Sequence, residues 1–177
     1  ERVAMIENIS EEGASCPKFK VSTMSSEYEA KTVLLATGTE HRKLGVPGEK
    51  EYANKGVSYC ALCDGAFFKE KIVCVVGGGD SAAKEALFLS EHAKKVYLIV
   101  RRDVLRAEPL NAKRVDENEK VEVLFKTEIE EIRGDEKSVT KVKFKETEGA
   151  HSGEEMEMDG VFMAIGHDAQ TELAEQL

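Results

Sequence analysis

The sequence has no apolar run of membrane-spanning length, no surplus of basic residues and only four cysteines. A membrane helix needs about 20 consecutive apolar residues, so we expect no membrane partner. The net charge of −9 argues against nucleic acid as a partner, because neutralising phosphates requires excess lysine and arginine. Four cysteines in 177 residues do not form a disulfide framework, and no signal-peptide pattern opens the chain. We therefore expect a cytoplasmic protein, in a reducing compartment.

The chain has enough apolar residues, 41%, to bury a core. Its length suggests one domain, or one domain and part of another. It opens in strand-like sequence without an initiator methionine, which predicts that it is cut from a longer protein. The first third predicts short strands at Val3–Ile9, Lys18–Thr23 and Thr32–Ala36. A turn is expected at 10–15, and a linker containing proline and glycine is expected at 41–56.

From Lys71 onward the pattern predicts a doubly wound α/β unit. After Lys71, residues 72–76 are continuously apolar, as in a strand buried on both faces of a parallel sheet. Three glycines follow, and 80–93 then predicts a helix with Ala82, Ala83, Ala86 and Leu87 on one face. The apolar run 95–100 predicts the next strand and completes a βαβ unit.

The rest of the chain predicts further elements of the same fold. A helix is expected near Pro109–Glu117, followed by a strand at 121–125 and two strands paired around the turn 134–138. A last apolar strand is expected at 160–166. The predicted fold class is therefore α/β: a Rossmann-like parallel sheet with an added antiparallel β-meander.

The glycine-rich turn predicts a dinucleotide phosphate site. Gly77, Gly79 and Ala82 form the pattern G-x-G-x-x-A. Gly77 permits a tight turn, Gly79 lets a pyrophosphate approach the backbone, and Ala82 lets the helix pack closely on the strand. The helix then offers unpaired N–H groups to the phosphates, and Asp80 or Ser81 is expected to cap its start. The alternative is a glycine-rich βα turn without a ligand, but the flanking strand and helix favour the phosphate site.

Arginines after the second strand of this unit indicate which dinucleotide is bound. Charge alone favours a solvated basic face over an anion site. However, Arg101 lies 22 residues after Gly79, and an NAD site would carry a carboxylate near this spacing. The sequence instead has Arg101, Arg102 and Arg106, whose guanidinium groups suit the 2′-phosphate of NADPH.

Cys60 and Cys63 form a Cys-x-x-Cys pair just before the βαβ unit. A thiol pair at this spacing can close a small disulfide and exchange it with a partner. Zinc is the rival hypothesis, but a structural zinc site needs four ligands and this pair supplies two. Inert thiols are the other alternative. Asp64 follows directly and is either a proton donor and acceptor for the thiols or part of an ordinary Asp-Gly turn.

These motifs, in this order, resemble the low-molecular-weight (bacterial-type) thioredoxin reductases over nearly the whole chain. The segment 59–82 is similar to that family's redox disulfide leading into its NADPH fingerprint, and 96–108 to its 2′-phosphate segment, with Val100 in place of a histidine. Residues 32–38 are similar to the segment that joins the flavin and nucleotide domains. The final strand, with Ile165 and Gly166, is similar to the end of the NADPH domain.

The resemblance implies a flavoenzyme in which NADPH reduces FAD, FAD reduces the Cys60–Cys63 disulfide, and the dithiol reduces thioredoxin. It implies that Cys63 faces the flavin, that Cys60 attacks the partner disulfide and that Asp64 handles the proton. The nucleotide would be held by the fingerprint, the arginines and the end of the last strand. These residues are Gly77, Gly79, Asp80, Ser81, Ala82, Arg101, Arg102, Arg106, Ile165 and Gly166. The intact enzyme would be a homodimer.

The chain departs from the family pattern in having a single glycine fingerprint, without the second one that holds the FAD pyrophosphate. We therefore expect residues 1–52 to be part of an FAD domain and linker, and 53–177 to be the NADPH domain with the redox pair. The isolated fragment is expected to bind NADPH but little FAD. Two alternatives stay open: a flavoprotein reductase of another disulfide carrier, such as a peroxiredoxin system, and a non-catalytic NADP(H)-binding module.

Overall fold

A computed structural model describes residues 2–11 and 16–177, which fall into two compact units. Unit 1 comprises residues 1–40 and 167–177, and unit 2 comprises residues 41–166. The turn expected at 10–15 lies mostly outside the described residues. The chain passes between the units twice, near β4 (Thr39–His41) and β13 (His167–Ala169), which pair in a two-stranded sheet.

Unit 1 contains an antiparallel sheet of three strands in sequence order. These are β1 (Val3–Asn8), β2 (Phe19–Thr23) and β3 (Glu27–Ala30), and the short 3₁₀ helix η2 (Ala174–Gln176) belongs to the same unit. The strands predicted near the positions of β1 and β2 are confirmed. The strand predicted at Thr32–Ala36 is wrong, because no neighbouring strand in the described chain accepts its backbone hydrogen bonds. Leu34, at the centre of that apolar run, is 91% exposed.

Unit 2 is built on a parallel sheet of five strands in the order β5-β12-β6-β7-β8. Its strands are β5 (Val57–Ser58), β6 (Ile72–Val76), β7 (Lys95–Val100), β8 (Val121–Phe125) and β12 (Gly160–Met163). Every neighbouring pair is parallel. The chain moves outward from β6 to β8, whereas β5 and β12 lie on the other side of β6. The order of strands therefore reverses at β6, which is where doubly wound sheets bind their ligands.

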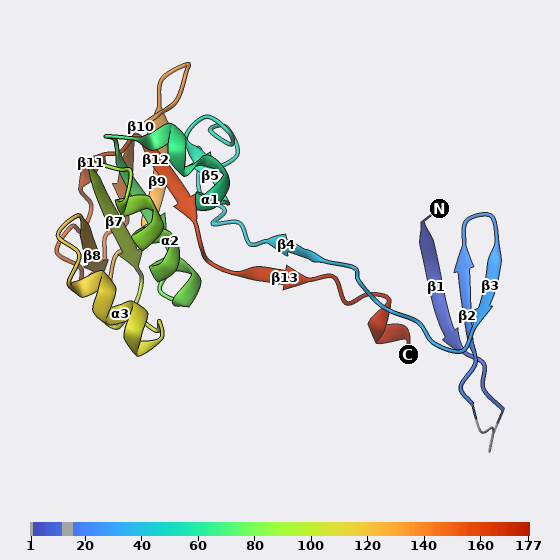
Figure 1. Ribbon diagram of the computed structural model, residues 1–177. Helices are drawn as coiled ribbons and strands as arrows, with labels where there is room; N and C mark the ends of the chain where they lie inside the picture. Colours follow the sequence, from blue (N-terminus) through green and yellow to red (C-terminus); the bar gives the residue numbers. More distant parts are fainter. Residues whose placement is uncertain (1, 12–15) are drawn as a thin grey trace. The chain divides into compact units, whose positions relative to one another are not determined.

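Helices cover one face of this sheet (Figure 1). They are α1 (Ala61–Asp64) with the 3₁₀ turn η1 (Gly65–Phe68), α2 (Asp80–Ser90) and α3 (Pro109–Asp116). Val73 and Val75 of β6 point into the core beneath the helices, together with Ala82 and Ala86 of α2. These alanines are fully buried, as predicted from their spacing on one helical face.

An antiparallel meander covers the other face of the sheet. It consists of β9 (Ile129–Gly134), β10 (Val139–Phe144) and β11 (Glu155–Glu157). Cys74 and Val76 of β6 point into the core on this side, where Ile132 and Phe144 meet them. The alternation along β6 confirms the prediction of a strand buried on both faces. The predicted α/β class with an added meander is correct, and so is the pairing around 134–138.

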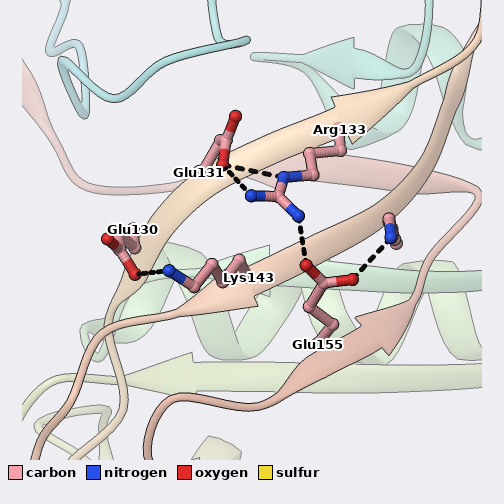
Figure 2. A network of polar contacts seen from close by, with 6 residues as sticks. Glu130, Glu131, Arg133, Lys143 and Glu155 are labelled. Atoms are coloured by element: carbon pink, nitrogen blue, oxygen red, sulfur yellow. Dashed lines mark hydrogen bonds and ion pairs between the residues drawn. The ribbon is translucent and has the colours of Figure 1, made fainter.

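The outer surface of the meander carries ion pairs within one strand and between strands (Figure 2). Arg133 of β9 binds Glu131 at 2.6 Å and also pairs with Glu155 of β11. Lys143 of β10 binds Glu130 at 2.8 Å. The Lys143–Glu130 pair joins the neighbouring strands β10 and β9 and favours their register, but exposed pairs add little to stability.

The boundary between the units differs from the predicted boundary at 52/53. Residues 41–52 belong to unit 2 through their contacts. The Ile132 amide donates to the Pro47 carbonyl at 3.0 Å, and Tyr52 is buried in the core of the meander side. At the other end, Gln170 donates its amide to the Gly38 carbonyl at 3.1 Å, within unit 1. The contacts therefore divide the chain at 40/41 and 166/167.

Candidate redox and nucleotide site

The predicted site residues of unit 2 gather along one edge of the parallel sheet. Because β5, β12, β6 and β7 all run in the same direction, their carboxyl ends meet at that edge. The cysteine pair follows β5, Ile165 and Gly166 follow β12, the glycine turn follows β6, and the arginines follow β7. The redox pair and the phosphate turn are thus two strands apart along one edge.

Gly77 makes the turn out of β6 in a conformation that requires glycine. Its φ is +152°, and a Cβ here would lie 2.3 Å from the Ala164 carbonyl oxygen and 2.9 Å from Cβ of Ala82. Its amide donates to the Ile99 carbonyl at 3.0 Å. Strand β12, strand β7 and helix α2 therefore all approach the same residue. This close approach is what the G-x-G-x-x-A pattern predicts.

Gly79 is the N-cap of α2 and has open space around it. No atom lies within 4 Å of where a Cβ would be, so a phosphate can approach the backbone here. The helix continues for 11 residues and directs its unpaired N–H groups to this side. Ser81 is exposed on the first turn.

The capping role predicted for Asp80 or Ser81 is wrong. Asp80 is the first helical residue, and the cap, Gly79, has no side-chain hydrogen bond. The Asp80 carboxylate instead accepts from Nδ2 of Asn111 at 2.7 Å and binds Lys84 at 2.6 Å. Hydrogen bonds from Lys84 and Asn111 lower the pKa of Asp80 to about 2. Asp80 therefore anchors the start of α3 beside the turn.

Backbone contacts hold the arginine segment beside the turn. The Arg106 amide donates to the Gly78 carbonyl at 2.7 Å, and Arg102 accepts at its carbonyl from the Lys126 amide at 2.9 Å. Arg101, Arg102 and Arg106 are all exposed. Within the described ranges, none of the three guanidinium groups forms an ion pair with a carboxylate. They are available to an anionic ligand at this edge.

Ile165 and Gly166 continue from β12 past the phosphate turn. The preceding residue, Ala164, donates its amide to the Val76 carbonyl at 2.9 Å. Gly166 has a φ of +105° and accepts at its carbonyl from the Arg42 amide at 3.0 Å. Ile165 packs partly against the core of the meander side. Both residues thus lie at the carboxyl edge of the parallel sheet.

Cys60 and Cys63 form a disulfide at the start of α1, with 5.3 Å between their Cα atoms. Cys60 is the N-cap of this short helix, and its Sγ accepts from the Cys63 amide at 3.1 Å. Cys60 is half-buried and Cys63 is exposed, so a partner can reach the pair. Among the described residues no group of three or more His, Cys, Asp or Glu side chains is arranged to hold a metal ion.

A buried serine, which the sequence analysis did not single out, connects the cysteine pair with Asp64. The Ser58 hydroxyl donates to Oδ2 of Asp64 at 2.6 Å and accepts from the Cys60 amide at 3.1 Å. Ser58 is 5% exposed. Only its place two residues before Cys60 could have marked it in the sequence.

Tyr59 and Glu49 form a second contact that sequence reasoning missed. Glu49 is 5% exposed, and its oxygens accept from the Leu44 amide at 3.0 Å and the Gly45 amide at 2.6 Å. Tyr59 lies beneath Lys43, whose Nζ is 3.7 Å from the centre of the ring. Burial and the hydrogen bond to Glu49 raise the pKa of the Tyr59 phenol. The hydrogen bonds of Ser58 to Asp64 and of Tyr59 to Glu49 thus fix the chain directly before the cysteine pair.

Two further features lie away from this edge. Cys74 is fully buried in β6, and burial raises the pKa of its thiol to about 12, so it is not a redox candidate. A cleft of about 720 Å³, lined by Ser90, Arg114 and Lys120 among others, lies near the amino ends of β7 and β8. None of the helices in the described chain is both long and apolar enough to cross a membrane.

Comparisons with known proteins identify the family of the chain. The family model described as pyridine nucleotide-disulphide oxidoreductase matches residues 6–177. The chain is 48% identical over 151 residues to a thioredoxin reductase of Listeria innocua, which covers 84% of this chain and 47% of that protein. It is 44% identical over 178 residues to a thioredoxin reductase of Schizosaccharomyces pombe, covering 97% of this chain and 55% of that protein.

A solved structure gives the same result for the fold. A crystal structure of Lactococcus lactis thioredoxin reductase superposes with a TM-score of 0.83 at 38% identity. The match covers 99% of this chain and 56% of that chain. The chain therefore spans about half the length of the relatives that it matches.

Proposed function

The chain belongs to the pyridine nucleotide-disulphide oxidoreductase family, and we propose that it is the NADPH-binding and disulfide-carrying part of a thioredoxin reductase. The proposal assigns nucleotide binding and the redox pair to unit 2, at residues 41–166. Unit 1, at residues 1–40 and 167–177, would be a portion of the flavin domain. We therefore place the boundary at 40/41 rather than at the predicted 52/53.

One observation carries this proposal: the disulfide and the phosphate turn share the carboxyl edge of one parallel sheet. A nucleotide-binding module without redox chemistry has no need for an accessible disulfide on that edge. A thiol pair without a nucleotide partner has no need for the open glycine turn and unpaired arginines. The combination supports transfer of electrons from a dinucleotide to a disulfide partner.

The nucleotide half of the proposal assigns NADPH to the turn between β6 and α2. Gly79 leaves room for the pyrophosphate, and the first turn of α2 offers it N–H donors. Arg101, Arg102 and Arg106 would bind the 2′-phosphate through charge-assisted hydrogen bonds. Ile165 and Gly166 would border the nucleotide at the end of β12. When bound, NADPH would supply a hydride, whose two electrons would reach the Cys60–Cys63 disulfide through the flavin of the full-length protein.

The disulfide half of the proposal is a thiol–disulfide exchange. The Cys60 thiolate attacks a partner disulfide, which forms a mixed disulfide and releases one partner thiolate. The Cys63 thiolate then attacks Sγ of Cys60, which re-forms the Cys60–Cys63 bond and releases the second partner thiolate. Two electrons pass to the partner, and the two protons of the dithiol end on the partner's thiols. Asp64 carries a proton between the sulfurs of the two proteins.

The flavin cannot be assigned to residues of this chain. The sequence contains one glycine fingerprint, and that fingerprint lies in unit 2. We therefore name no residue of unit 1 as an FAD ligand. Thioredoxin as the partner, a homodimer as the assembly and the reducing cytoplasm as the location all belong to the same proposal.

The test uses the full-length natural protein. We expect it to purify yellow, to lose flavin absorbance when NADPH is added under anaerobic conditions, and to reduce thioredoxin at the expense of NADPH. A colourless protein that binds NADPH would contradict a reductase and indicate a binding module. A flavoprotein that reduces a peroxiredoxin-type carrier but not thioredoxin would instead change the assigned partner.

A further inference from the structure

Ser58 is the residue through which Asp64 and the redox pair contact each other. Its Oγ lies 2.6 Å from Oδ2 of Asp64, 3.1 Å from the Cys60 amide nitrogen and 3.4 Å from the Cys60 carbonyl oxygen. The residue is 5% exposed, so water does not replace these partners easily. All three contacts lie within the strand-to-helix turn that carries the disulfide.

A serine hydroxyl has one proton, and here it has two acceptors within reach. When Asp64 is ionised, its carboxylate has no proton, so Ser58 must donate across the 2.6 Å contact. When Asp64 is protonated, its O–H can donate to Oγ across the same contact. The Ser58 proton can then turn to the Cys60 carbonyl, the other acceptor. The Cys60 amide donates to Oγ in both arrangements.

Both protonation states of Asp64 are therefore satisfied without movement of the backbone. A half-buried carboxyl group that left a polar atom unpaired in one state would resist taking up or losing a proton, because an unpaired buried group is costly. We propose that Ser58 is a positioning residue for proton transfer in disulfide exchange: its hydroxyl reverses direction as Asp64 gains and loses a proton. This inference rests on the proposed reductase function and adds a residue to it.

The elements packed against α1 contribute few other titratable groups. Helix α1 packs against η1, which has none, and against α2, which carries Asp80, Lys84 and Glu85. Asp80 and Lys84 bind each other at 2.6 Å. The ring of Phe88 lies against Gly65, where an added Cβ would be 3.2 Å from a ring carbon. Glu85 precedes Phe88 by about one turn of α2. Glu85 is thus the carboxyl group of α2 that is not paired with Lys84.

The chemical step remains balanced with Ser58 included. Cys63 loses its proton to Asp64, the resulting thiolate attacks Sγ of Cys60 in the mixed disulfide and re-forms the Cys60–Cys63 bond, and the partner's thiolate leaves. Asp64 then gives the proton to that leaving thiolate. Ser58 makes and breaks no covalent bond with the partner; it donates to Asp64 before the proton arrives and accepts from it afterwards.

The test is a double-mutant cycle in the full-length flavin-loaded protein. We expect Ser58→Ala to lower kcat for thioredoxin reduction about tenfold, since general acid–base catalysis contributes about 10² or more. In an Asp64→Asn background, Ser58→Ala should change kcat less than about twofold, because the two residues act as a unit. Equal losses in both backgrounds would mean that Ser58 supports only the local fold, and would overturn the proposal.

A second pair of variants separates the hydroxyl from packing. Ser58→Thr and Ser58→Val have the same shape, and a β-branched side chain suits strand β5. We expect the threonine variant to retain at least half of the wild-type kcat and the valine variant to behave as Ser58→Ala. Indistinguishable threonine and valine variants would overturn the proposal even if Ser58→Ala proved too unstable to load flavin.

Matched measurements keep this inference separate from the proposed function. Ser90 is a buried serine of α2 whose hydroxyl donates to the Leu87 carbonyl at 2.6 Å, far along the chain from the disulfide. Ser90→Ala should leave turnover unchanged.

Apart from turnover, the pH titration of thiolate absorbance in the reduced protein should shift in Ser58→Ala only when Asp64 is present. Failure of the wild-type protein to reduce any disulfide partner would refute the reductase itself, whereas a fully active Ser58→Ala variant would refute this inference alone.

Discussion

The phenol oxygen of Tyr59 donates a 2.8 Å hydrogen bond to Oε1 of Glu49. Tyr59 precedes the redox pair, and Glu49 belongs to the stretch that enters unit 2. The buried Glu49 carboxylate has no cation bound to it in the described chain and is held by three neutral donors. The contact therefore ties the backbone of Cys60 to a segment that lies eleven residues earlier.

Tyr59→Phe should lower the free energy of unfolding by about 1–3 kcal/mol, because it leaves a buried carboxylate with one donor fewer. Chemical denaturation of the full-length protein measures the loss. Tyr97→Phe is the matched control, since Lys95 also lies over that ring, at 5.6 Å, but no carboxylate is bound to the phenol in the described structure. Equal losses in the two variants would show that the Glu49 contact contributes nothing specific.

Gly79→Ala should weaken NADPH binding at least about tenfold, or 1.4 kcal/mol, without changing stability. Its new Cβ would enter open space that the pyrophosphate is expected to use. Gly77→Ala should instead lower stability by about 1–3 kcal/mol, because its Cβ meets the Ala164 carbonyl and its φ is positive. Calorimetric titration and thermal unfolding separate the two effects. A Gly79→Ala protein that binds NADPH normally would remove the pyrophosphate from this turn.

Replacing both Arg101 and Arg102 by alanine should weaken NADPH binding at least about tenfold more than NADH binding. Only NADPH has a 2′-phosphate, and hydrogen bonds between charged groups contribute about 1.5–3 kcal/mol each. Titration with each nucleotide gives the ratio. Arg114→Ala is the control, since Arg114 is an exposed arginine that lines the cleft near the other end of the strands. Parallel losses for NADPH and NADH would contradict the phosphate assignment.

Glu85→Gln should make the protein more stable than wild type at neutral pH, but not in mild acid. Burial raises the pKa of Glu85 from 4.5 to about 7, and its Oε2 has no hydrogen-bond partner in the described structure. The unfolded chain therefore ionises first as pH rises, and wild-type stability falls between pH 4.5 and 7. Thermal unfolding of both proteins across this range should show the difference in Tm growing with pH. A constant difference would mean that Glu85 titrates normally.

Local pattern was sufficient to predict the βαβ unit, the meander and the glycine-rich turn between β6 and α2. Each depends on a period or spacing within a few residues: the apolar run of β6, the alanine face of α2, and the glycines at 77 and 79. The predicted strand at Thr32–Ala36 is wrong because a strand depends on a pairing partner and not on local pattern alone. An apolar run becomes a strand only beside a neighbour, and the described chain supplies none for it.

The contacts around the cysteine pair were beyond local prediction. Glu49 and Tyr59 meet through the folded linker, and a glutamate in a glycine-rich segment carries no signal that it is buried. Asp80 was expected at the helix cap by its residue type, but tertiary contacts with Asn111 and Lys84 use its carboxylate instead. The boundary between the units likewise depends on where residues 41–52 pack.

The segment that carries the disulfide is anchored at both ends. Near its beginning, Asp64 accepts a hydrogen bond from Ser58 of β5. At its end, Phe68 is buried against β12, so closely that a Cβ added to Gly160 would lie 2.3 Å from the phenyl ring. Phe68 also packs edge-on against Phe162, with ring centres 5.1 Å apart. A segment fixed in this way cannot move independently of the sheet on which it packs. Amide exchange across 61–68 should therefore be as slow as in the strands beneath.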